Sequence, residues 1–396
     1  MSPSRRRILI LAEWYFPHQG GSEQVGHQAA LALTRAGHEV TVHTPAFPGD
    51  AAFDAAQPYR IVRSALWART RLWEVRGGLP NRIGRLVAAA LIFFRAAFSP
   101  WDALLCVHLP ILALPGKLLR MMGRRRIYAW ALGEEISIGE KSAAMRRQLA
   151  MALNNAHRII AISSDTADAV RAFGIPKERI ILQFPTPAAA FFESLNAEAA
   201  AAARQRHADR DAMLLVTVAR LVERKGIDTT LRALAGLRGT VSRKFVYVVA
   251  GTGPCEQSLK ALASELKLND VVKFIGGCNE EEKLPLMEAA DLFLTPNRQL
   301  PSGEKEGFGI VFVEAALRGT PSIAGRSGGT SDAVSEDVSG WLVDAQDHRQ
   351  LEEMLRVLMA DPDRLSRMRS GARDWAMSLF PSHRDHSPLI ELLEER

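Results

Sequence analysis

The sequence predicts an α/β protein made of two Rossmann-like, doubly wound domains, and three observations support this prediction. Short apolar runs alternate with helix-like segments along most of the chain, a pattern typical of parallel sheets covered by helices. At 396 residues, the chain is longer than one ordinary hydrophobic core accommodates, so two domains are expected. Its hydrophobic content of 47% and charged content of 24% are those of a globular protein that folds in water.

The first half opens with a βαβ pattern. We expect a strand within residues 7–16, a helix over Gln24–Ala36 that ends at Gly37, and a strand over Glu39–Pro45. Further strands of this half are expected at residues 102–109, 125–132 and 158–164.

The second half repeats the alternation of strands and helices. Its strands are expected at residues 213–221, 244–251, 271–276, 291–296, 320–325 and 340–344. We place an N-terminal, acceptor-side domain at residues 1–192 and a C-terminal, nucleotide-sugar-binding domain at 193–375. The polar, alanine-rich stretch 193–211 marks the join. Residues 376–396 are expected to return to the N-terminal domain.

Charge is unevenly distributed between the two halves. Residues 1–190 hold 24 Lys and Arg against 13 Asp and Glu, a net charge of +11, whereas the remainder has a net charge of −5. A cationic surface favours phosphorylated substrates or anionic lipids, and no nucleic-acid motif accompanies it. The apolar stretch Leu86–Phe98 is shorter than the ~20 residues that a membrane span requires. It suits either a core helix or a helix lying on an anionic membrane, beside basic residues at 69, 71, 76 and 124–126.

The number and spacing of the cysteines indicate the kind of cellular compartment in which the protein folds. Cys106, Cys255 and Cys278 lie far apart and form no C-x-x-C motif. A disulfide framework or a structural zinc site is therefore not expected, and a reducing cytoplasm fits this composition. We expect a cytoplasmic protein, and the two interpretations of Leu86–Phe98 leave open whether it also binds peripherally to the inner face of the cell membrane.

The segment 294–329 carries the most informative polar residues. Glu306 and Glu314 stand eight positions apart, and a Gly-Phe-Gly turn follows the first of them. Eight helical residues span ~12 Å, so we expect one carboxylate at the mouth of a helix and the other about two turns into it. This separation suits an elongated polar ligand that is held at two hydroxyl clusters. It does not suit two carboxylates that share one bond to be cleaved, which lie ~5–9 Å apart.

Two further groups of residues follow strands. Arg220 and Lys225 come after the first strand of the second half, where a helix begins, and cations at a helix N-terminus can hold a diphosphate. The alternative is a solvent-exposed basic turn. Glycines in two other strand-to-helix turns permit close approach of a nucleotide, although a plain tight turn would also use them; they are Gly20, Gly21, Gly251 and Gly253.

The sequences EGFGIVFVEAA, GTPSIAG and SGGTSDAV resemble those of the retaining glycosyltransferases of family 4. The resemblance implies a GT-B fold, in which two Rossmann-like domains face a cleft, and a nucleotide-sugar donor without a metal or other cofactor. It assigns Glu306 to the donor sugar, Glu314 to the ribose, and Arg220 with Lys225 to the diphosphate. The turn between the glutamates completes the donor site through Gly307, Phe308 and Gly309.

The amino-acid sequences of these motifs are most similar to those of phosphatidylinositol mannosyltransferase-like members, which use GDP-mannose. We therefore expect a hexosyltransferase that moves mannose to a lipid-linked or glycan acceptor. The family implies a front-face substitution in which the diphosphate helps to deprotonate the acceptor. Two alternatives remain open at this point. One is a sugar-nucleotide epimerase with the GT-B architecture, and the other is a binding subunit with weak catalytic activity.

Two departures from the family pattern concern the acceptor side. Leu132 occupies the place of a histidine that many members carry, and a leucine can neither donate nor accept a proton. The residues Phe-Pro-Thr-Pro at 184–187 replace an Asn-Gly-Val-Asp sequence. The pairs Asp209/Asp211 and Asp361/Asp363 have metal-ligand spacing but lie in polar turns, and we expect solvated turns at both.

Overall fold

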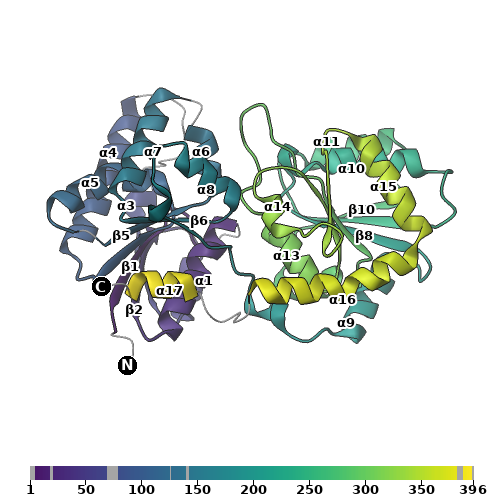
Figure 1. The fold of residues 1–396 in the computed structure, drawn as a ribbon, viewed down its shortest axis with the longest axis horizontal. Helices are drawn as coiled ribbons and strands as arrows, with labels where there is room; N and C mark the ends of the chain where they lie inside the picture. Colours follow the sequence, from purple (N-terminus) through teal and green to yellow (C-terminus); the bar gives the residue numbers. More distant parts are fainter. Residues whose placement is uncertain are drawn as a thin grey trace. The chain divides into compact units, whose positions relative to one another are not determined.

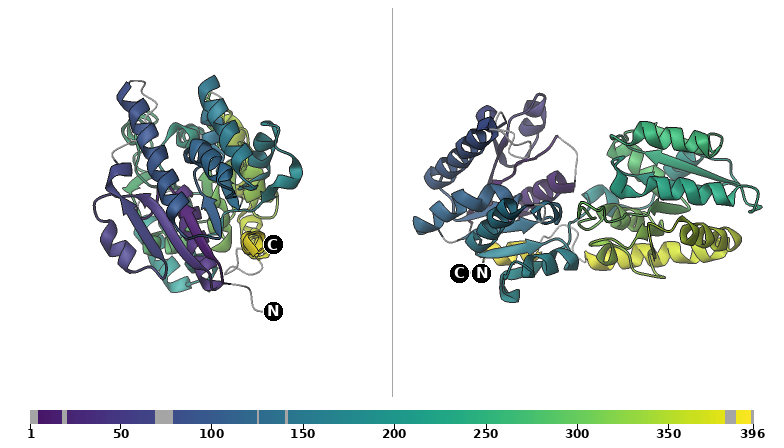
Figure 2. Two further views of the ribbon diagram at one scale, coloured as in Figure 1. Left: turned by 90° about the vertical axis from the view of Figure 1, so that its left-hand side faces the viewer. Right: turned by 90° about the horizontal axis from the view of Figure 1, so that it is seen from above.

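The structure is a computed structural model, and it describes residues 5–17, 21–68, 79–124, 126–139, 142–380 and 387–394. The chain forms two compact units (Figure 1). Unit 1 comprises Met1–Thr186 together with Arg384–Arg396, and unit 2 comprises Pro187–His383. Each unit contains one parallel sheet with helices on both faces (Figures 1 and 2), so the predicted α/β class is confirmed.

Unit 1 is built on a seven-stranded sheet in the order β3-β2-β1-β4-β5-β6-β7. Its strands are β1 (Arg7–Leu11), β2 (Glu39–Pro45), β3 (Arg60–Ser64), β4 (Ala103–Cys106), β5 (Ile127–Ala131), β6 (Arg158–Ala161) and β7 (Ile180–Leu182). Its helices are α1 (Gly21–Arg35), α2 (Asp50–Ala55), α3 (Ala65–Ala68), α4 (Leu79–Phe98), α5 (Ala113–Met121), α6 (Glu134–Gly139), α7 (Ala143–Asn155), α8 (Ser164–Arg171) and α17 (Ser387–Glu394), with short 3₁₀ helices η1 (Leu109–Leu112) and η2 (Lys177–Arg179).

The central strands of unit 1 explain its core. β4 and β5 are buried along their full length, because helices cover both faces of a parallel sheet. Gly37 has a φ of 90°, and its backbone N–H bonds to the carbonyl of Thr34, so it ends α1 as predicted. The edge strands β3 and β7, which we did not predict, are only partly buried.

The end of the chain lies on the sheet of unit 1. α17 covers the face opposite α4, α5 and α7 (Figure 1). It buries Leu389, Leu392 and Leu393, and the Tyr128 hydroxyl donates a 3.3 Å hydrogen bond to the backbone carbonyl of Leu392.

Unit 2 is built on a six-stranded parallel sheet in the order β10-β9-β8-β11-β12-β13. Its strands are β8 (Met213–Val218), β9 (Phe245–Ala250), β10 (Val272–Gly276), β11 (Leu292–Thr295), β12 (Ser322–Gly325) and β13 (Gly340–Val343). Its helices are α9 (Ala197–His207), α10 (Ile227–Leu237), α11 (Glu256–Glu265), α12 (Glu280–Ala289), α13 (Ile310–Leu317), α14 (Thr330–Ala333), α15 (His348–Ala360) and α16 (Pro362–Leu379), with 3₁₀ helices η3 (Ala189–Phe192) and η4 (Glu223–Lys225).

The segment that we expected to join the domains is partly helical. The chain passes from unit 1 to unit 2 between Thr186 and Pro187, within the Phe-Pro-Thr-Pro sequence that departs from the family pattern. The alanine-rich stretch that follows forms α9, which packs against α12 in unit 2.

α4 contains the apolar stretch discussed above and has two different faces. Ala88, Ile92 and Ala96 are buried in the core of unit 1, whereas Phe94 and Phe98 on the opposite face are 56% and 76% exposed. Within the described residues, the structure contains no helix with the length and apolar character needed to cross a bilayer. The basic residues at 69, 71, 76 and 125 lie outside the described residues.

Candidate active site

The predicted donor-binding residues of the second half meet at one edge of the sheet of unit 2. The strand order reverses direction between β8 and β11, and open α/β sheets bind ligands outside the carboxyl ends of strands at such a switch point. The loop after β8 carries Arg220 and Lys225, and the loop after β11 carries Glu306. The fold therefore brings Lys225 into contact with Glu306, which is 81 residues away in the sequence.

Glu306 is the centre of a buried polar cluster. Its Oε2 atom accepts hydrogen bonds from Arg224 Nη1 at 2.6 Å and from Lys225 Nζ at 2.7 Å, and also from the amide of Asn297. Burial alone raises the pKa of the Glu306 carboxyl. The charges of Lys225 and Arg224, together with their hydrogen bonds, outweigh burial and lower this pKa to about 2. The carboxylate is therefore ionised, and its orientation is fixed.

Glycines allow the loops around this cluster to pack closely. A side chain at Gly226 would overlap the carbonyl oxygen of Pro296, and one at Gly328 would overlap the carbonyl oxygen of Glu306. Both glycines have positive φ angles, 66° and 57°, which favour glycine. The backbone N–H of Gly329 donates a 3.0 Å hydrogen bond to the Glu306 carbonyl. These contacts hold the backbone of Glu306 as well as its side chain.

The two predicted diphosphate ligands differ in their surroundings. Lys225 is buried and bonded to Glu306, as described above. Arg220 is exposed, and its side chain makes no hydrogen bond or ion pair with the part of the chain that the structure describes. Arg224, which we did not single out from the sequence, joins Lys225 at Glu306. The sequence offered one indication of this role: Arg224 directly precedes Lys225, a predicted diphosphate ligand, in a basic turn.

Glu314 lies on α13, but its position differs from our expectation. The helix begins at Ile310, after Gly309 with a φ of 92°, so Glu306 precedes the helix and Glu314 lies just over one turn into it. The expected separation of two helical turns is therefore wrong. The reason is that the Gly-Phe-Gly turn is not helical. In that turn Phe308 is buried, and Gly307 is partly buried.

Glu314 is 1% exposed, and its carboxylate is short of hydrogen-bond donors. Neither oxygen accepts a hydrogen bond from the described residues. Lys283 Nζ lies 2.6 Å from Oε2, where it forms an ion pair without the geometry of a hydrogen bond. Lys283, on α12, also lies over the ring of Phe191 at 4.8 Å. No local pattern distinguished this lysine in the sequence, because its ion pair joins α12 to a residue of α13 that lies 31 positions later.

The predicted glycines have different environments. A side chain at Gly251, which has a φ of 145°, would overlap the carbonyl oxygen of Ala219. A side chain at Gly253 would overlap that of Leu221. Close packing against the loop after β8 thus accounts for both, and contact with a nucleotide remains a prediction. Gly21 begins α1 and has open space beside it, whereas Gly20 lies outside the described residues.

Unit 1 carries its own buried polar groups at the carboxyl edge of its sheet. His108, after β4, accepts a 3.1 Å hydrogen bond at Nδ1 from the backbone N–H of Glu13, and burial lowers its pKa to about 4. Glu135 accepts a 2.8 Å hydrogen bond from the backbone N–H of Leu132, and burial raises its pKa to about 7. From the sequence we noted Leu132 as a departure from the family pattern, but we did not single out His108 or Glu135 as site residues. Both follow strands of the same sheet at its carboxyl edge, as Leu132 does.

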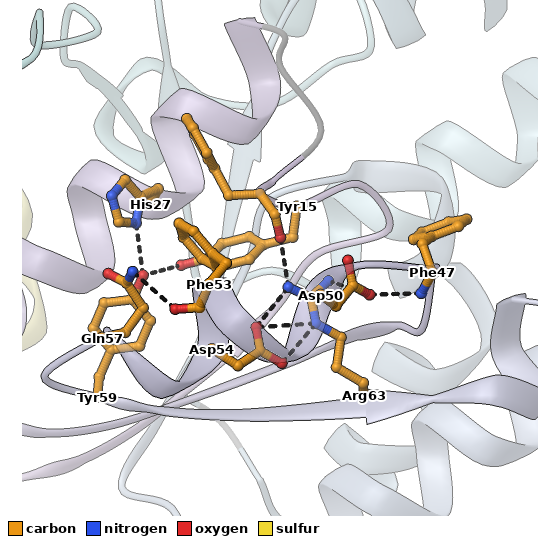
Figure 3. Close-up of polar contacts among 10 residues, drawn as sticks. Tyr15, His27, Phe47, Asp50, Phe53, Asp54, Gln57, Tyr59 and Arg63 are labelled. Carbon is orange, nitrogen blue, oxygen red and sulfur yellow. Dashed lines mark hydrogen bonds and ion pairs between the residues drawn. The ribbon is translucent and has the colours of Figure 1, made fainter.

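An aromatic and polar cluster surrounds the segment that follows β1 (Figure 3). Its side chains come from that segment, from α1 and α2, and from β3 and the residues before it. The Tyr15 hydroxyl donates to the Tyr59 hydroxyl at 2.9 Å, and the latter lies 2.6 Å from His27 Nδ1. Burial, with a smaller contribution from Arg35, lowers the pKa of His27 to about 4. The ring is therefore neutral at pH 7, and Nδ1 can accept the hydrogen bond from Tyr59.

Arg63 ties the same loop to its neighbours. Its guanidinium donates to both carboxylate oxygens of Asp54 at 2.7–3.2 Å and lies 3.1 Å from Asp50 (Figure 3). It also donates to the backbone carbonyl of Phe16. These buried contacts hold the backbone that follows β1 at Phe16 against α2 and β3.

The metal-ligand spacings noted in the sequence have structural roles or are solvated. Asp361 caps α16 by accepting a hydrogen bond from the backbone N–H of Arg364. Asp209 and Asp211 are exposed, as is Asp363. No three His, Cys, Asp or Glu side chains in the described residues form a cluster that could hold a metal ion.

Comparison with known proteins relates this arrangement to a family. The model of the family described as Glycosyl transferases group 1 matches residues 200–375, and that of Glycosyltransferase Family 4 matches residues 19–182. The chain is 32% identical over 398 residues to the GDP-mannose-dependent alpha-(1-6)-phosphatidylinositol monomannoside mannosyltransferase of Mycolicibacterium smegmatis, covering 98% of each protein. It is 30% identical to the protein of the same name from Mycobacterium tuberculosis, with 93% of each covered.

Solved structures share the fold. HepE of Anabaena in complex with UDP and glucose has a TM-score of 0.76 at 19% identity, with 98% of this chain and 97% of that chain covered. Sucrose-phosphate synthase from Thermosynechococcus elongatus has a TM-score of 0.76 at 20% identity, with 96% of each chain covered. WaaG, a glycosyltransferase involved in lipopolysaccharide biosynthesis, has a TM-score of 0.71 at 19% identity, with 98% and 97% covered. Together, these findings show that the chain belongs to glycosyltransferase family 4 and is a hexosyltransferase of GT-B fold that uses a nucleotide sugar.

Proposed function

We propose that this enzyme transfers mannose from GDP-mannose to a phosphatidylinositol-mannoside-type glycolipid, with retention of the anomeric configuration and without a metal ion. The observation that carries the proposal is the ionised Glu306 held by Lys225 and Arg224 at the switch point of unit 2. The choice of mannose and of a lipid acceptor is supported by the names of the two mycobacterial relatives.

In this proposal, residues of unit 2 bind three parts of the donor: the diphosphate, the sugar and the ribose. Arg220, which is exposed and has no partner among the described residues, and the neighbouring Lys225 stabilise the charge that develops on the leaving diphosphate. Glu306 accepts hydrogen bonds from hydroxyls of the donor sugar. Glu314 accepts from the ribose, whose adjacent hydroxyls add hydrogen bonds to the ion pair that this carboxylate makes with Lys283.

The reaction forms a bond between the acceptor oxygen and the anomeric carbon, and breaks the bond from that carbon to the diphosphate oxygen. The acceptor proton passes to the departing diphosphate, which carries the negative charge. Attack and departure take place on the same face of the sugar, so the anomeric configuration is kept. Arg220 and Lys225 lower the barrier electrostatically because they are positioned before charge develops.

The test is an activity assay with purified protein. GDP-mannose, UDP-glucose, UDP-galactose and UDP-N-acetylglucosamine are each incubated with and without phosphatidylinositol monomannoside in the presence of a chelator. We expect nucleotide release that depends on both GDP-mannose and the lipid. An epimerised sugar without acceptor would show an epimerase, and binding without any turnover would show a binding subunit. Loss of activity in the chelator would contradict metal independence.

The proposal includes docking of unit 1 to an anionic membrane, where a lipid acceptor lies. The exposed face formed by α4 and α5 combines apolar and basic side chains, and these two helices pack against each other. Its members are Leu86, Val87, Phe94, Arg95, Phe98, Leu114, Lys117, Arg120, Met121 and Met122. Exposed apolar side chains beside cations suit a helix lying in the interface of an anionic bilayer.

Vesicle co-sedimentation tests this docking. We expect binding to anionic vesicles and not to neutral ones, with release at high salt because ions screen the basic residues. Exchange of both Phe94 and Phe98 for serine should reduce binding, whereas Val338→Ser, which removes an exposed apolar side chain from unit 2, should not. Replacing the arginines at 69, 71 and 76 with glutamine should also reduce vesicle binding while leaving nucleotide affinity unchanged. Equal binding by all proteins, or none to anionic vesicles at low salt, would contradict the docking.

A further inference from the structure

A pocket of about 300 Å³ lies in unit 2, away from the donor-binding loops. It is lined by Arg204, Arg243, Ala289, Asp291, Leu365, Ser366 and Arg369. Arg243 stands two residues before β9, and Asp291 directly precedes β11, so the pocket lies at the amino edge of the sheet. The donor loops follow the carboxyl ends of the same strands. The six residues of β8 separate the two edges by roughly 20 Å at 3.3 Å per residue.

The pocket has a surplus of positive charge. Three arginines line it, and the acidic residue among the lining side chains is Asp291. That carboxylate is already satisfied, because Oδ2 lies 2.8 Å from Arg204 Nη2 and accepts a 2.7 Å hydrogen bond from the backbone N–H of Leu214. Glu288, which is close to Arg369, is held in a buried ion pair with Arg318. Two of the three guanidinium groups, those of Arg243 and Arg369, therefore have no ion-pair partner among the residues that the structure describes.

Two of the arginines have structural roles that leave donors unused. Arg369 donates to the backbone carbonyls of Glu288 and Ala290 at 2.7 Å, and Arg204 donates to that of Ala289 at 2.9 Å. These bonds satisfy carbonyls at the C-terminus of α12, where cations are favoured. Each guanidinium has five N–H donors, so both retain donors for a further acceptor. Burial lowers the pKa of Arg369 and, although Asp291 opposes this shift, the nearby Arg204 adds to it.

Arg243 has no such structural role. Its guanidinium makes no hydrogen bond or ion pair with any described residue, and its Nη1 atom is shielded from solvent. A shielded cationic donor without an acceptor is unfavourable, and an anion in the pocket would satisfy it. Phosphate matches this need, because its several oxygens can accept charge-assisted hydrogen bonds from more than one guanidinium.

We propose that this pocket is a second ligand site, which binds the phosphate group of a small soluble molecule through Arg243, Arg204 and Arg369. Its volume is at the lower end of the range for small-molecule sites, which fits a phosphate or a compact phosphomonoester and not a whole nucleotide sugar. Because its lining residues come from α9, α12, α16 and the starts of two strands, binding there links elements of unit 2 that are distant in sequence.

The experiment uses inorganic phosphate as the probe and the full chain carrying Lys225→Gln, which removes one cation of the donor site and so weakens phosphate binding there. Binding is measured by calorimetry against chloride at equal ionic strength. Three further changes are added singly to this background. Arg243→Gln removes the unpaired guanidinium. Ser366→Phe fills the pocket without removing a charge. Arg232→Gln is the matched control, since Arg232 is an exposed arginine of α10 that has no partner among the described residues.

We expect phosphate to bind the Lys225→Gln protein and Arg232→Gln to leave the dissociation constant within about twofold. Arg243→Gln should weaken binding by at least about tenfold, in line with the loss of a charge-assisted hydrogen bond. Ser366→Phe should weaken it similarly while all three guanidinium groups remain, which keeps the test valid if Arg243→Gln does not fold. Absence of phosphate binding to the Lys225→Gln protein, or binding that survives both pocket changes, would overturn the proposal.

Discussion

The change Glu306→Gln removes the negative charge with which both Lys225 and Arg224 pair, and it keeps the shape of the side chain. The two cations lower the pKa of the Glu306 carboxyl from 4.5 to about 2. Each pKa unit corresponds to ~1.4 kcal/mol, so the folded protein favours the ionised form by roughly 3 kcal/mol. Since the Glu306 side chain is only 11% exposed, solvent screens this interaction little. We expect the variant to lose up to that free energy of unfolding at pH 7.

Hydrogen exchange of peptides from β8 and β11 measures this loss in unit 2 without interference from unit 1. Glu336→Gln is the matched control, because Glu336 pairs with Arg326 at 3.3 Å on an exposed surface, where such pairs contribute at most about 1 kcal/mol. The effect of Glu306 also has a defined pH dependence. A lowered folded-state pKa gives stability that is present above pH 4.5 and lost as the pH falls toward 2. Equal protection in Glu306→Gln and Glu336→Gln would refute this reasoning.

The same variant separates structure from ligand binding. GDP supplies a diphosphate whose charge can replace that of Glu306 beside Lys225 and Arg224. GDP should therefore stabilise Glu306→Gln at least as much as it stabilises the native protein, even though sugar transfer is reduced. Glu314→Gln should instead weaken GDP binding, because its carboxylate is assigned to the ribose. Calorimetry that gave the reverse ranking of the two variants would overturn both assignments.

Three other changes have definite expected outcomes. Lys225→Ala should lower kcat at least about tenfold in steady-state assays, since losing one charge-stabilising donor costs ~3 kcal/mol, and unchanged turnover would remove Lys225 from the site. Burial raises the pKa of Glu135 to about 7, so the folded protein keeps a proton that the unfolded chain loses above pH 4.5. The free energy of unfolding should accordingly fall as the pH rises from 4.5 to 7. In denaturation series across this pH range, Glu135→Gln should remove the part of the fall that Glu135 causes. Identical pH profiles for the native protein and the variant would refute the assignment. Gly251→Ala should destabilise the protein by roughly 2 kcal/mol or more, because its φ is 145° and its new side chain would overlap the Ala219 carbonyl; Gly277→Ala, with open space around it, should not, and equal melting temperatures would contradict this.

The sequence predicted the buried strands and the edge strands of unit 2, but it did not predict the edge strands of unit 1. Strands such as β8 and β9 are covered on both faces and therefore appear as continuous apolar runs. β3 reads Arg-Ile-Val-Arg-Ser and β7 has three residues, and both lie at the edges of the seven-stranded sheet. An edge strand is partly solvated, so its sequence need not contain an apolar run.

The candidate site was predictable as a set of residues but not as a set of contacts. Glu306, Lys225 and Arg220 follow strands, and that position relative to the sheet is visible in the sequence. The pairing of Glu306 with Lys225 depends on β11 lying next to β8, which is a property of the strand order. The position of Glu314 was misjudged because the αL conformation of Gly309 delays the start of α13.

In the proposed reaction, the enzyme moves mannose from GDP-mannose to a lipid acceptor on the same face of the sugar. The most direct measurement uses GDP-mannose labelled with ¹³C at the anomeric carbon, phosphatidylinositol monomannoside as the acceptor, and a chelator. Nuclear magnetic resonance of the extracted lipid then reports the configuration of the new bond. We predict an α-mannosidic product formed in equal amount to the GDP released; a β-linked product, free mannose alone, or no transfer by the folded protein would contradict the account.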